Sequence, residues 1–174
     1  MKYLCSPQVF SCIAVKYMNK VFRWVANLPT PLFVGVFWAV GFLWNIAFNL
    51  FAWYVCSGPT SQGDFEPPQS VYDYVTYIFL APLIETVLFQ ALPYYLLNKI
   101  AFFRSRIWLI ILVSSLAFAL SHFYSIGYVF FSFFPGVLFM TGYYLRQGKH
   151  PFASIYMVHL LINTIPLAYE LIFS

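Results

Sequence analysis

The longest apolar run in the sequence, from Pro31 to Cys56, contains no charged residue. A helix needs about 20 predominantly apolar residues to cross the hydrocarbon core of a bilayer, so this run can span one. Of the 174 residues, 62% are hydrophobic and only 8% are charged, whereas an average soluble domain has about 25% charged residues. So few charges would leave large apolar patches of a soluble fold in water. The sequence therefore predicts a membrane protein and excludes disorder, nucleic-acid readout and a disulfide-stapled secreted fold.

Further apolar runs predict the rest of the fold. We expect spanning helices at Pro31–Cys56, about Val71–Asn98, Ile107 to about Tyr124, Ile126–Leu145 and Phe152–Phe173. Within residues 1–30, apolar side chains recur at helical spacing and the basic side chains lie largely on another face, which is typical of an amphipathic helix in the membrane interface. The predicted fold class is all-α, with this interfacial helix followed by a polytopic transmembrane bundle of about five helices over residues 31–174.

The basic residues indicate how the bundle is oriented. They precede the first predicted span, follow the second and follow the fourth, so all the clusters fall on one side of the membrane. Basic loops are enriched on the cytoplasmic side, and we therefore expect a cytoplasmic N-terminus. The three cysteines have no metal-ligand spacing and predict no disulfide framework. The composition favours no particular oligomeric state.

A few polar residues lie inside the predicted spans. A charged side chain at mid-bilayer costs at least about 2.5 kcal/mol, so those that persist usually mark a function. The candidates are Glu85 in the second span, His122 in the third, and His159 and Asn163 in the fifth. At 1.5 Å per residue, all four lie about 14–24 Å from the basic side. We therefore expect them to meet at one depth of the bilayer.

These residue types suit hydrolysis of an amide bond by an activated water. Glu85 beside a histidine can exchange protons with a water and act as a general base. His159 and Asn163 are four residues apart and share one helix face. Donors from a histidine and from the Asn163 amide can stabilise the oxyanion of a tetrahedral intermediate.

Three sequence motifs carry these residues: APLIETVLFQ with Glu85 and Phe89, FALSH from Phe118 to His122, and HLLIN from His159 to Asn163. Together they resemble the motifs E-E-x-x-x-R, F-x-x-x-H and H-x-x-x-N of the CPBP family. These proteins are intramembrane glutamate endopeptidases related to CAAX-processing and bacteriocin-processing proteases. The order of the motifs, their separate helices and their common depth make the combination specific.

The resemblance implies a protease that acts on a membrane-associated peptide or protein, without a metal, in a bacterial cytoplasmic membrane. It implies that Glu85 and His122 activate water and that His159 and Asn163 form the oxyanion site. The supporting positions carried over from the motifs are Thr86, Phe89, Gln90 and Phe118.

Two positions depart from the family pattern. Thr86 stands in place of the second glutamate, and Gln90 stands in place of the arginine. Replacing only one member of a buried ion pair would leave an unpaired charge, which is costly. Because both are replaced, we expect a compensated, neutral pair in which Thr86 and Gln90 can still hydrogen bond.

Other functions remain open at this point. Glu85, His122 and His159 could hold zinc with a water as the fourth ligand, although the resemblance points to a site without metal. A non-catalytic scaffold or bacteriocin-immunity protein with the same fold is the main alternative, and a proton or ion pathway is a weaker one. We expect Asn45 and Asn49 to form hydrogen bonds between helices.

Overall fold

The computed structural model describes residues 20–56 and 70–173, and these residues form helices joined by short turns. The helices are α2 Lys20–Asn27, α3 Thr30–Cys56, α4 Val71–Val75, η1 Thr76–Leu80, α5 Ala81–Thr86, η2 Val87–Ala91, α6 Leu92–Leu97, α7 Ala101–Arg104, α8 Ile107–Ser121, α9 Ile126–Leu145 and α10 Pro151–Phe173. The predicted all-α class is confirmed. Much of the predicted interfacial helix lies outside the described residues, so the division of the chain near residue 30 stays a prediction.

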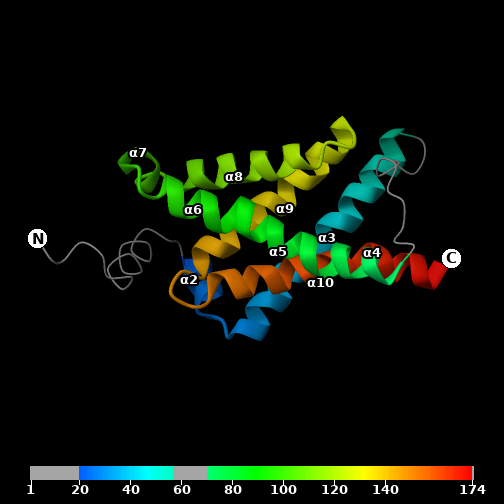
Figure 1. Cartoon of the computed structure of the whole chain (residues 1–174), viewed down its shortest axis with the longest axis horizontal. Coiled ribbons are helices and arrows are strands. Elements are labelled where there is room, and N and C mark those ends of the chain that lie inside the picture. Colours follow the sequence, from blue (N-terminus) through cyan, green and yellow to red (C-terminus); the bar gives the residue numbers. More distant parts are fainter. Residues whose placement is uncertain (1–19, 57–69, 174) are drawn as a thin grey trace, which may run out of the picture.

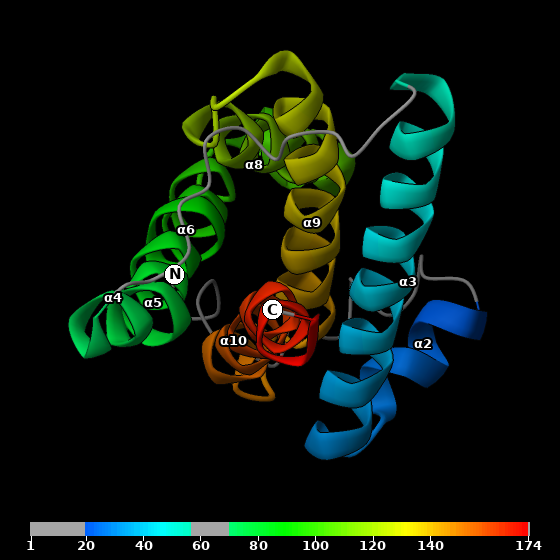
Figure 2. The ribbon, with the colours of Figure 1, turned by 90° about the vertical axis from the view of Figure 1, so that its right-hand side faces the viewer.

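The helices pack around α9. Seen from the end of the bundle, α9 lies centrally, with α8, α10 and α3 around it (Figure 2). The row from α4 to α6 runs along the opposite side from α3 and contacts both α8 and α10. As a result, the second, third and fifth predicted spans all lie beside α9.

Three helical stretches in the described residues are long and apolar enough to cross a membrane: Thr30–Val55, Val71–Leu97 and Ile126–Leu145. Two shorter apolar helices, Ile107–Ser121 and Pro151–Leu167, accompany them. These five correspond to the five predicted spans. The third ends at Ser121 rather than near Tyr124, so His122 caps that helix instead of lying within it.

The second span is continuous but irregular. It contains two π-helical segments, η1 and η2, in which each turn is one residue wider than in an α-helix. Pro82 follows η1, and the N–H before it, that of Ala81, donates to the Thr76 carbonyl five residues back. Pro93 follows η2 in the same way. Proline lacks an N–H and crowds the preceding turn. We infer that the wider π-helical turns accommodate Pro82 and Pro93, so that the helix continues past both.

The described basic residues gather at one end of the molecule. Helix α2, the turn around α7 and the turn between α9 and α10 all lie at this end (Figure 1). The basic side chains that they carry are Lys20, Arg23, Lys99, Arg104, Arg106, Arg146 and Lys149. This grouping is the charge asymmetry that the sequence predicts, and the assignment of this end to the cytoplasm stays a prediction.

Arg146 fixes the turn between α2 and α3 to this basic end. Its side chain is buried and donates to the Leu28 carbonyl at 3.0 Å, to Thr30 Oγ1 at 2.6 Å and to Ser154 Oγ at 3.4 Å. The guanidinium carbon lies 4.9 Å from the centre of the Phe33 ring. The donors of a buried cation are thus used by carbonyl and hydroxyl oxygens near the end of α2, where a helix dipole favours positive charge.

Candidate active site

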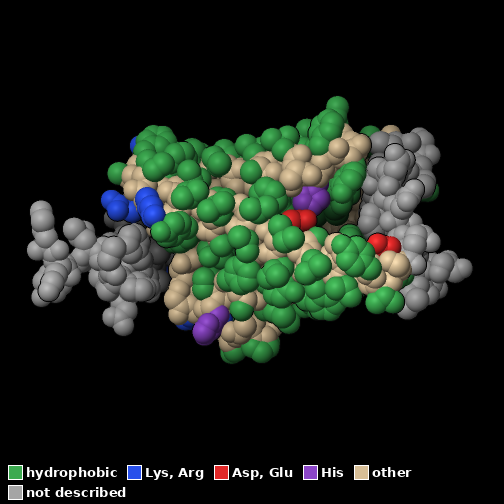
Figure 3. All heavy atoms as spheres, in the orientation of Figure 1, with side chains coloured by type: hydrophobic (Ala, Val, Ile, Leu, Met, Phe, Trp, Pro, Cys, Tyr) green, Lys and Arg blue, Asp and Glu red, His purple; other side chains and the backbone are tan. Residues whose placement is uncertain are grey.

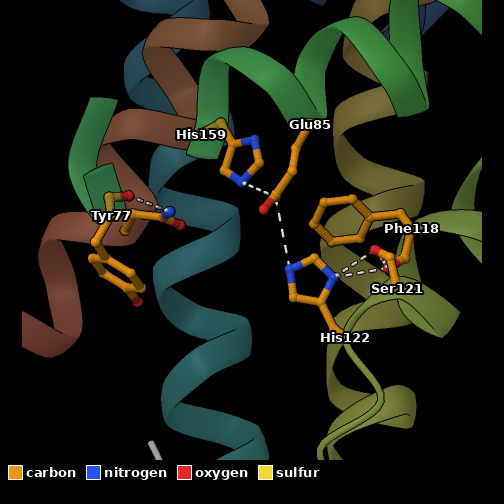
Figure 4. Close-up of polar contacts among 7 residues, drawn as sticks. Tyr77, Glu85, Phe118, Ser121, His122 and His159 are labelled. Atoms are coloured by element: carbon orange, nitrogen blue, oxygen red, sulfur yellow. Dashed lines mark hydrogen bonds and ion pairs between the residues drawn. The ribbon is translucent and has the colours of Figure 1, made fainter. Parts of the chain in front are cut away.

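Three of the four predicted site residues lie together. Glu85 comes from α5, His122 from the end of α8 and His159 from α10 (Figure 4). Glu85 Oε2 is 3.2 Å from His159 Nε2 and 3.7 Å from His122 Nε2. One carboxylate oxygen therefore faces both imidazole rings, as expected from the common depth of these residues.

A cavity of about 210 Å³ adjoins this group. Its lining residues come from all five apolar helices and include all four predicted site residues: Gly41, Trp44, Asn45, Tyr77, Ala81, Glu85, Phe118, His122, Tyr124, Tyr128, Phe131, Ser132, Pro135, Phe139, His159, Ile162, Asn163 and Pro166. The side chains of Glu85 and His122 are 21% and 19% exposed, whereas that of His159 is 3% exposed. An acidic and a histidine side chain meet on one face of the bundle among apolar side chains (Figure 3). The cavity therefore has room for water beside groups that can activate it.

His122 lies at the C-terminal end of α8, where its side chain contacts the last turn of the helix. Its Nδ1 atom lies 2.8 Å from the Phe118 carbonyl and 3.2 Å from Ser121 Oγ (Figure 4). A carbonyl oxygen can only accept, so Nδ1 carries the hydrogen of this contact. In neutral His122 the other nitrogen, Nε2, is therefore an acceptor, and it faces Glu85. The four-residue spacing of F-x-x-x-H places the acceptor carbonyl where it fixes this tautomer.

His159 has the opposite hydrogen-bonding role. Its ring stacks on Phe139, with centroids 4.3 Å apart at 30°, and meets Phe118 edge-on at 5.8 Å. Its Nδ1 is buried and has no hydrogen-bond partner among the described residues. If neutral His159 carries its hydrogen on Nε2, that N–H donates to the Glu85 carboxylate. The unpartnered Nδ1 is then only an acceptor, so no buried N–H lacks a partner at this ring. The arrangement therefore favours His159 as the donor that holds Glu85.

Asn163 lies in the same cavity but is not bonded to the group of three. Its Nδ2 donates to the Tyr77 carbonyl at 3.1 Å. In the five-residue register of η1, the N–H of residue 82 would serve this carbonyl, but Pro82 has none. Asn163 therefore supplies a donor that the proline removes, and one hydrogen of its amide group is committed to the backbone of the second span.

The expected hydrogen bond between Thr86 and Gln90 is absent, so that prediction is wrong. Both side chains are fully buried. Thr86 Oγ1 and both amide atoms of Gln90 have no hydrogen-bond partner within residues 20–56 and 70–173. The π-helical segment that begins at Val87 changes the helix register between the two positions, which gives a physical reason for the lost contact.

The two supporting phenylalanines pack beneath the site. Phe89 meets Phe118 edge-on, with ring centroids 5.6 Å apart at 87°. The Phe89 carbonyl, four residues before Pro93, accepts a hydrogen bond from Ser114 Oγ. This hydrogen bond joins the second and third spans.

Two other expectations concern metal ligands and asparagines. Among the described residues, no group of three His, Cys, Asp or Glu side chains is arranged to hold a metal ion. Asn49 Nδ2 donates to the Asn45 carbonyl at 2.8 Å and to Asn45 Oδ1 at 3.1 Å. The prediction that these asparagines join different helices is therefore wrong, because their contacts lie within α3.

A comparison with known protein families shows which family the chain belongs to. The profile of the Rce1-like type II CAAX prenyl endopeptidases matches residues 67–165, which is more than half of the 174 residues. The chain belongs to this family. The Rce1-like region contains all three motifs and the complete second, third and fourth spans. No curated protein and no solved structure matches the chain.

Sequence reasoning missed two features of this Rce1-like site. Nothing in the motifs singles out Tyr128, which lines the cavity from the first turn of α9. Nor did the motifs indicate that Asn163 bonds the Tyr77 carbonyl. The signal for the second feature was the proline five residues after Tyr77, since it leaves a carbonyl in need of a donor.

Proposed function

We propose that this Rce1-like protein is an intramembrane endopeptidase that hydrolyses a peptide bond of a membrane-associated peptide or protein. The observation that carries the proposal is Glu85 Oε2 facing two histidine nitrogens beside a cavity within the bundle. The family description supports a protein substrate of the prenylated C-a-a-X kind. The bilayer would be a bacterial cytoplasmic membrane, with the basic end inside.

The gap between Glu85 and His122 suits one water. Their facing atoms are 3.7 Å apart, which is too long for a direct hydrogen bond. Both atoms are acceptors when Glu85 is ionised and His122 is neutral, and a water has two hydrogens to donate. A water bound to both atoms would direct its oxygen lone pairs away from them, toward a substrate carbonyl in the cavity.

The reaction then needs only a water and the peptide. The water oxygen bonds to the carbonyl carbon while one of its protons passes to Glu85 or His122. The carbonyl π electrons move to the oxygen, which becomes the oxyanion of a tetrahedral intermediate. When the oxyanion re-forms the carbonyl, the C–N bond breaks and the leaving nitrogen takes up the transferred proton. The products are a carboxylic acid and an amine.

The other two motif residues support these steps. The 3.2 Å contact from His159 Nε2 supports a role in holding the Glu85 carboxylate in place. Asn163 uses one amide hydrogen on the Tyr77 carbonyl and has a second hydrogen on the same nitrogen. That second hydrogen can donate to the oxyanion, which is the role that the family resemblance implies.

The test compares two acid-to-amide variants in proteoliposomes. Wild type, Glu85→Gln and the matched control Asp73→Asn are assayed on a peptide ending in a prenylated C-a-a-X sequence and on its unprenylated twin. Asp73 lies in the capping box of α4, at the far end of the second span from the basic cluster. We expect Glu85→Gln to lose about 10²–10⁴-fold in kcat and Asp73→Asn to retain it.

New peptide termini in host membranes provide a substrate-independent measurement. Mass spectrometry of membranes containing wild type should reveal termini that are absent with Glu85→Gln. The proposal would be overturned if neither peptide is cleaved and no terminus depends on Glu85.

A non-catalytic scaffold or immunity protein is the second candidate. It is favoured by the buried side chains of Thr86 and Gln90, which have no hydrogen-bond partner in the part of the chain that the structure describes, at the positions where the family motif has two charged residues. This function predicts that Glu85→Gln complements a deletion strain as well as wild type does, whereas the protease predicts no complementation.

A further inference from the structure

The site has few donors left for an oxyanion. Proteases stabilise this charge with groups whose hydrogen bonds are not already used elsewhere. The His159 Nε2 hydrogen is directed at Glu85, and Asn163 has one hydrogen committed to the Tyr77 carbonyl. A second donor on the substrate side is therefore needed beside the remaining Asn163 hydrogen.

We propose that the hydroxyl of Tyr128 is this second donor, so that Tyr128 is a catalytic residue. The inference rests on the proposed protease function. Tyr128 is half-buried and lines the cavity that also contains Glu85, His122 and Asn163. Its hydroxyl makes no hydrogen bond with another residue in the described parts of the chain. This hydroxyl is not among the fully buried polar atoms that lack a partner, so it is accessible, and a substrate oxygen in the cavity can accept its hydrogen.

The local structure holds the Tyr128 ring near the reacting groups. Its backbone N–H donates to Ser125 Oγ at 3.1 Å, which caps α9 and fixes the start of the helix. The ring lies 6.2 Å from the His122 ring, centre to centre, and packs edge-on against Tyr124 at 5.2 Å. The turn that places His122 beside Glu85 therefore also positions Tyr128, six residues later.

The hydrogen bond from Tyr128 leaves the proton transfers of the proposed hydrolysis unchanged. As the water oxygen attacks, negative charge builds on the carbonyl oxygen, and the Tyr128 O–H donates a hydrogen bond to it. The phenol keeps its proton throughout, because the proton from water goes to Glu85 or His122 and then to the leaving nitrogen. Tyr128 therefore acts only on the charged state, which predicts an effect on kcat with little effect on KM.

The test removes one oxygen atom. Tyr128→Phe and the matched control Tyr95→Phe are assayed with Glu85→Gln and wild type on whichever peptide or identified membrane substrate wild type cleaves. Tyr95 lies on α6, is 61% exposed and is not among the residues that line the cavity. Loss of one oxyanion donor costs about 10²–10³-fold in kcat. We expect a loss in this range for Tyr128→Phe with KM within about threefold, and wild-type kinetics for Tyr95→Phe.

A tetrahedral inhibitor separates this role from packing. A phosphinate analogue of the cleaved peptide mimics the intermediate, so Tyr128→Phe should weaken its binding far more than substrate binding. If Tyr128→Phe leaves kcat unchanged or changes only KM, the inference about Tyr128 is overturned. If Glu85→Gln is inactive in the same assay, the proposed protease function still stands. If wild type cleaves no tested substrate faster than Glu85→Gln does, both the inference about Tyr128 and the proposed protease function would be overturned.

Discussion

The basic end and the candidate active site both contain buried polar groups, but these groups differ in how far they are hydrogen bonded. At the basic end, Arg146 donates to three oxygen atoms and fixes the turn between α2 and α3 to the bundle. In and around the site, polar atoms of Thr86, Gln90 and His159 are buried without partners among the described residues. Leaving a buried polar group unpaired costs about 1–3 kcal/mol. Buried polar groups are therefore paired and stabilise the fold at the basic end, whereas several around the candidate site have no partner among the described residues.

The residues of the candidate site also differ from one another in how fully their polar atoms are hydrogen bonded. Glu85 and His122 are partly exposed and face each other across a gap, whereas Asn163 is bonded to the backbone. Glu85 and His122 thus keep bonding capacity that a water or a substrate could use, whereas Asn163 spends one of its two amide hydrogens on the backbone. Each of the following predictions tests one side of this contrast.

The largest stability effect is expected at Arg146. Hydrogen bonds to charged groups each contribute about 1.5–3 kcal/mol, so Arg146→Met should lower the free energy of unfolding by about 3 kcal/mol. The measurement is a denaturation curve in detergent micelles. Arg104→Met is the control, because Arg104 is exposed at the same end. Equal losses in the two variants would show that the buried contacts do not stabilise the fold.

An effect of opposite sign is expected at Thr86 and Gln90. Replacing an unpaired buried polar group by an apolar one of similar shape removes its desolvation cost. The double variant Thr86→Val, Gln90→Leu should therefore gain about 1 kcal/mol or more in stability. The control Ser115→Ala should lose stability, since Ser115 Oγ is bonded to the Ile111 carbonyl at 2.6 Å. A strongly destabilised double variant would contradict the contrast.

The smallest effect is expected at Asn163. Asn163→Ala removes the donor to Tyr77 and should cost about 1 kcal/mol. Pro82→Ala restores a backbone N–H near the same carbonyl, so Asn163→Ala should cost less in that background. A double-mutant cycle of unfolding free energies measures the coupling. Additive effects would mean that the proline and the asparagine act independently.

Sequence alone predicted the spans well because their signal is local. Apolar runs separated by charged or proline-rich stretches fixed the limits of α3, α9 and α10 to within a residue or so. The end of α8 was less accurate, since the uncharged turn after Ser121 resembles the spans on either side in composition. The convergence of Glu85, His122 and His159 followed from depth counting, which needs only the helical rise.

Hydrogen-bond partners could not be predicted in the same way. Whether Thr86 meets Gln90 depends on a π-helical turn, and the choice between α and π turns is set by packing as well as by the prolines. Likewise, the bond from Asn163 to Tyr77 joins helices 86 residues apart in sequence. Tyr128 belongs to no motif, so only its place in the folded cavity draws attention to it.

In the proposed mechanism, Glu85 and His122 act as one unit on a shared water. The most direct test is a double-mutant cycle of kcat with Glu85→Gln, His122→Asn and the combined variant, with His150→Asn as a matched control in the exposed turn before α10. Residues that act as a unit are non-additive, so the combined variant should be about as slow as either single variant. Losses that multiply in the combined variant would contradict the shared water.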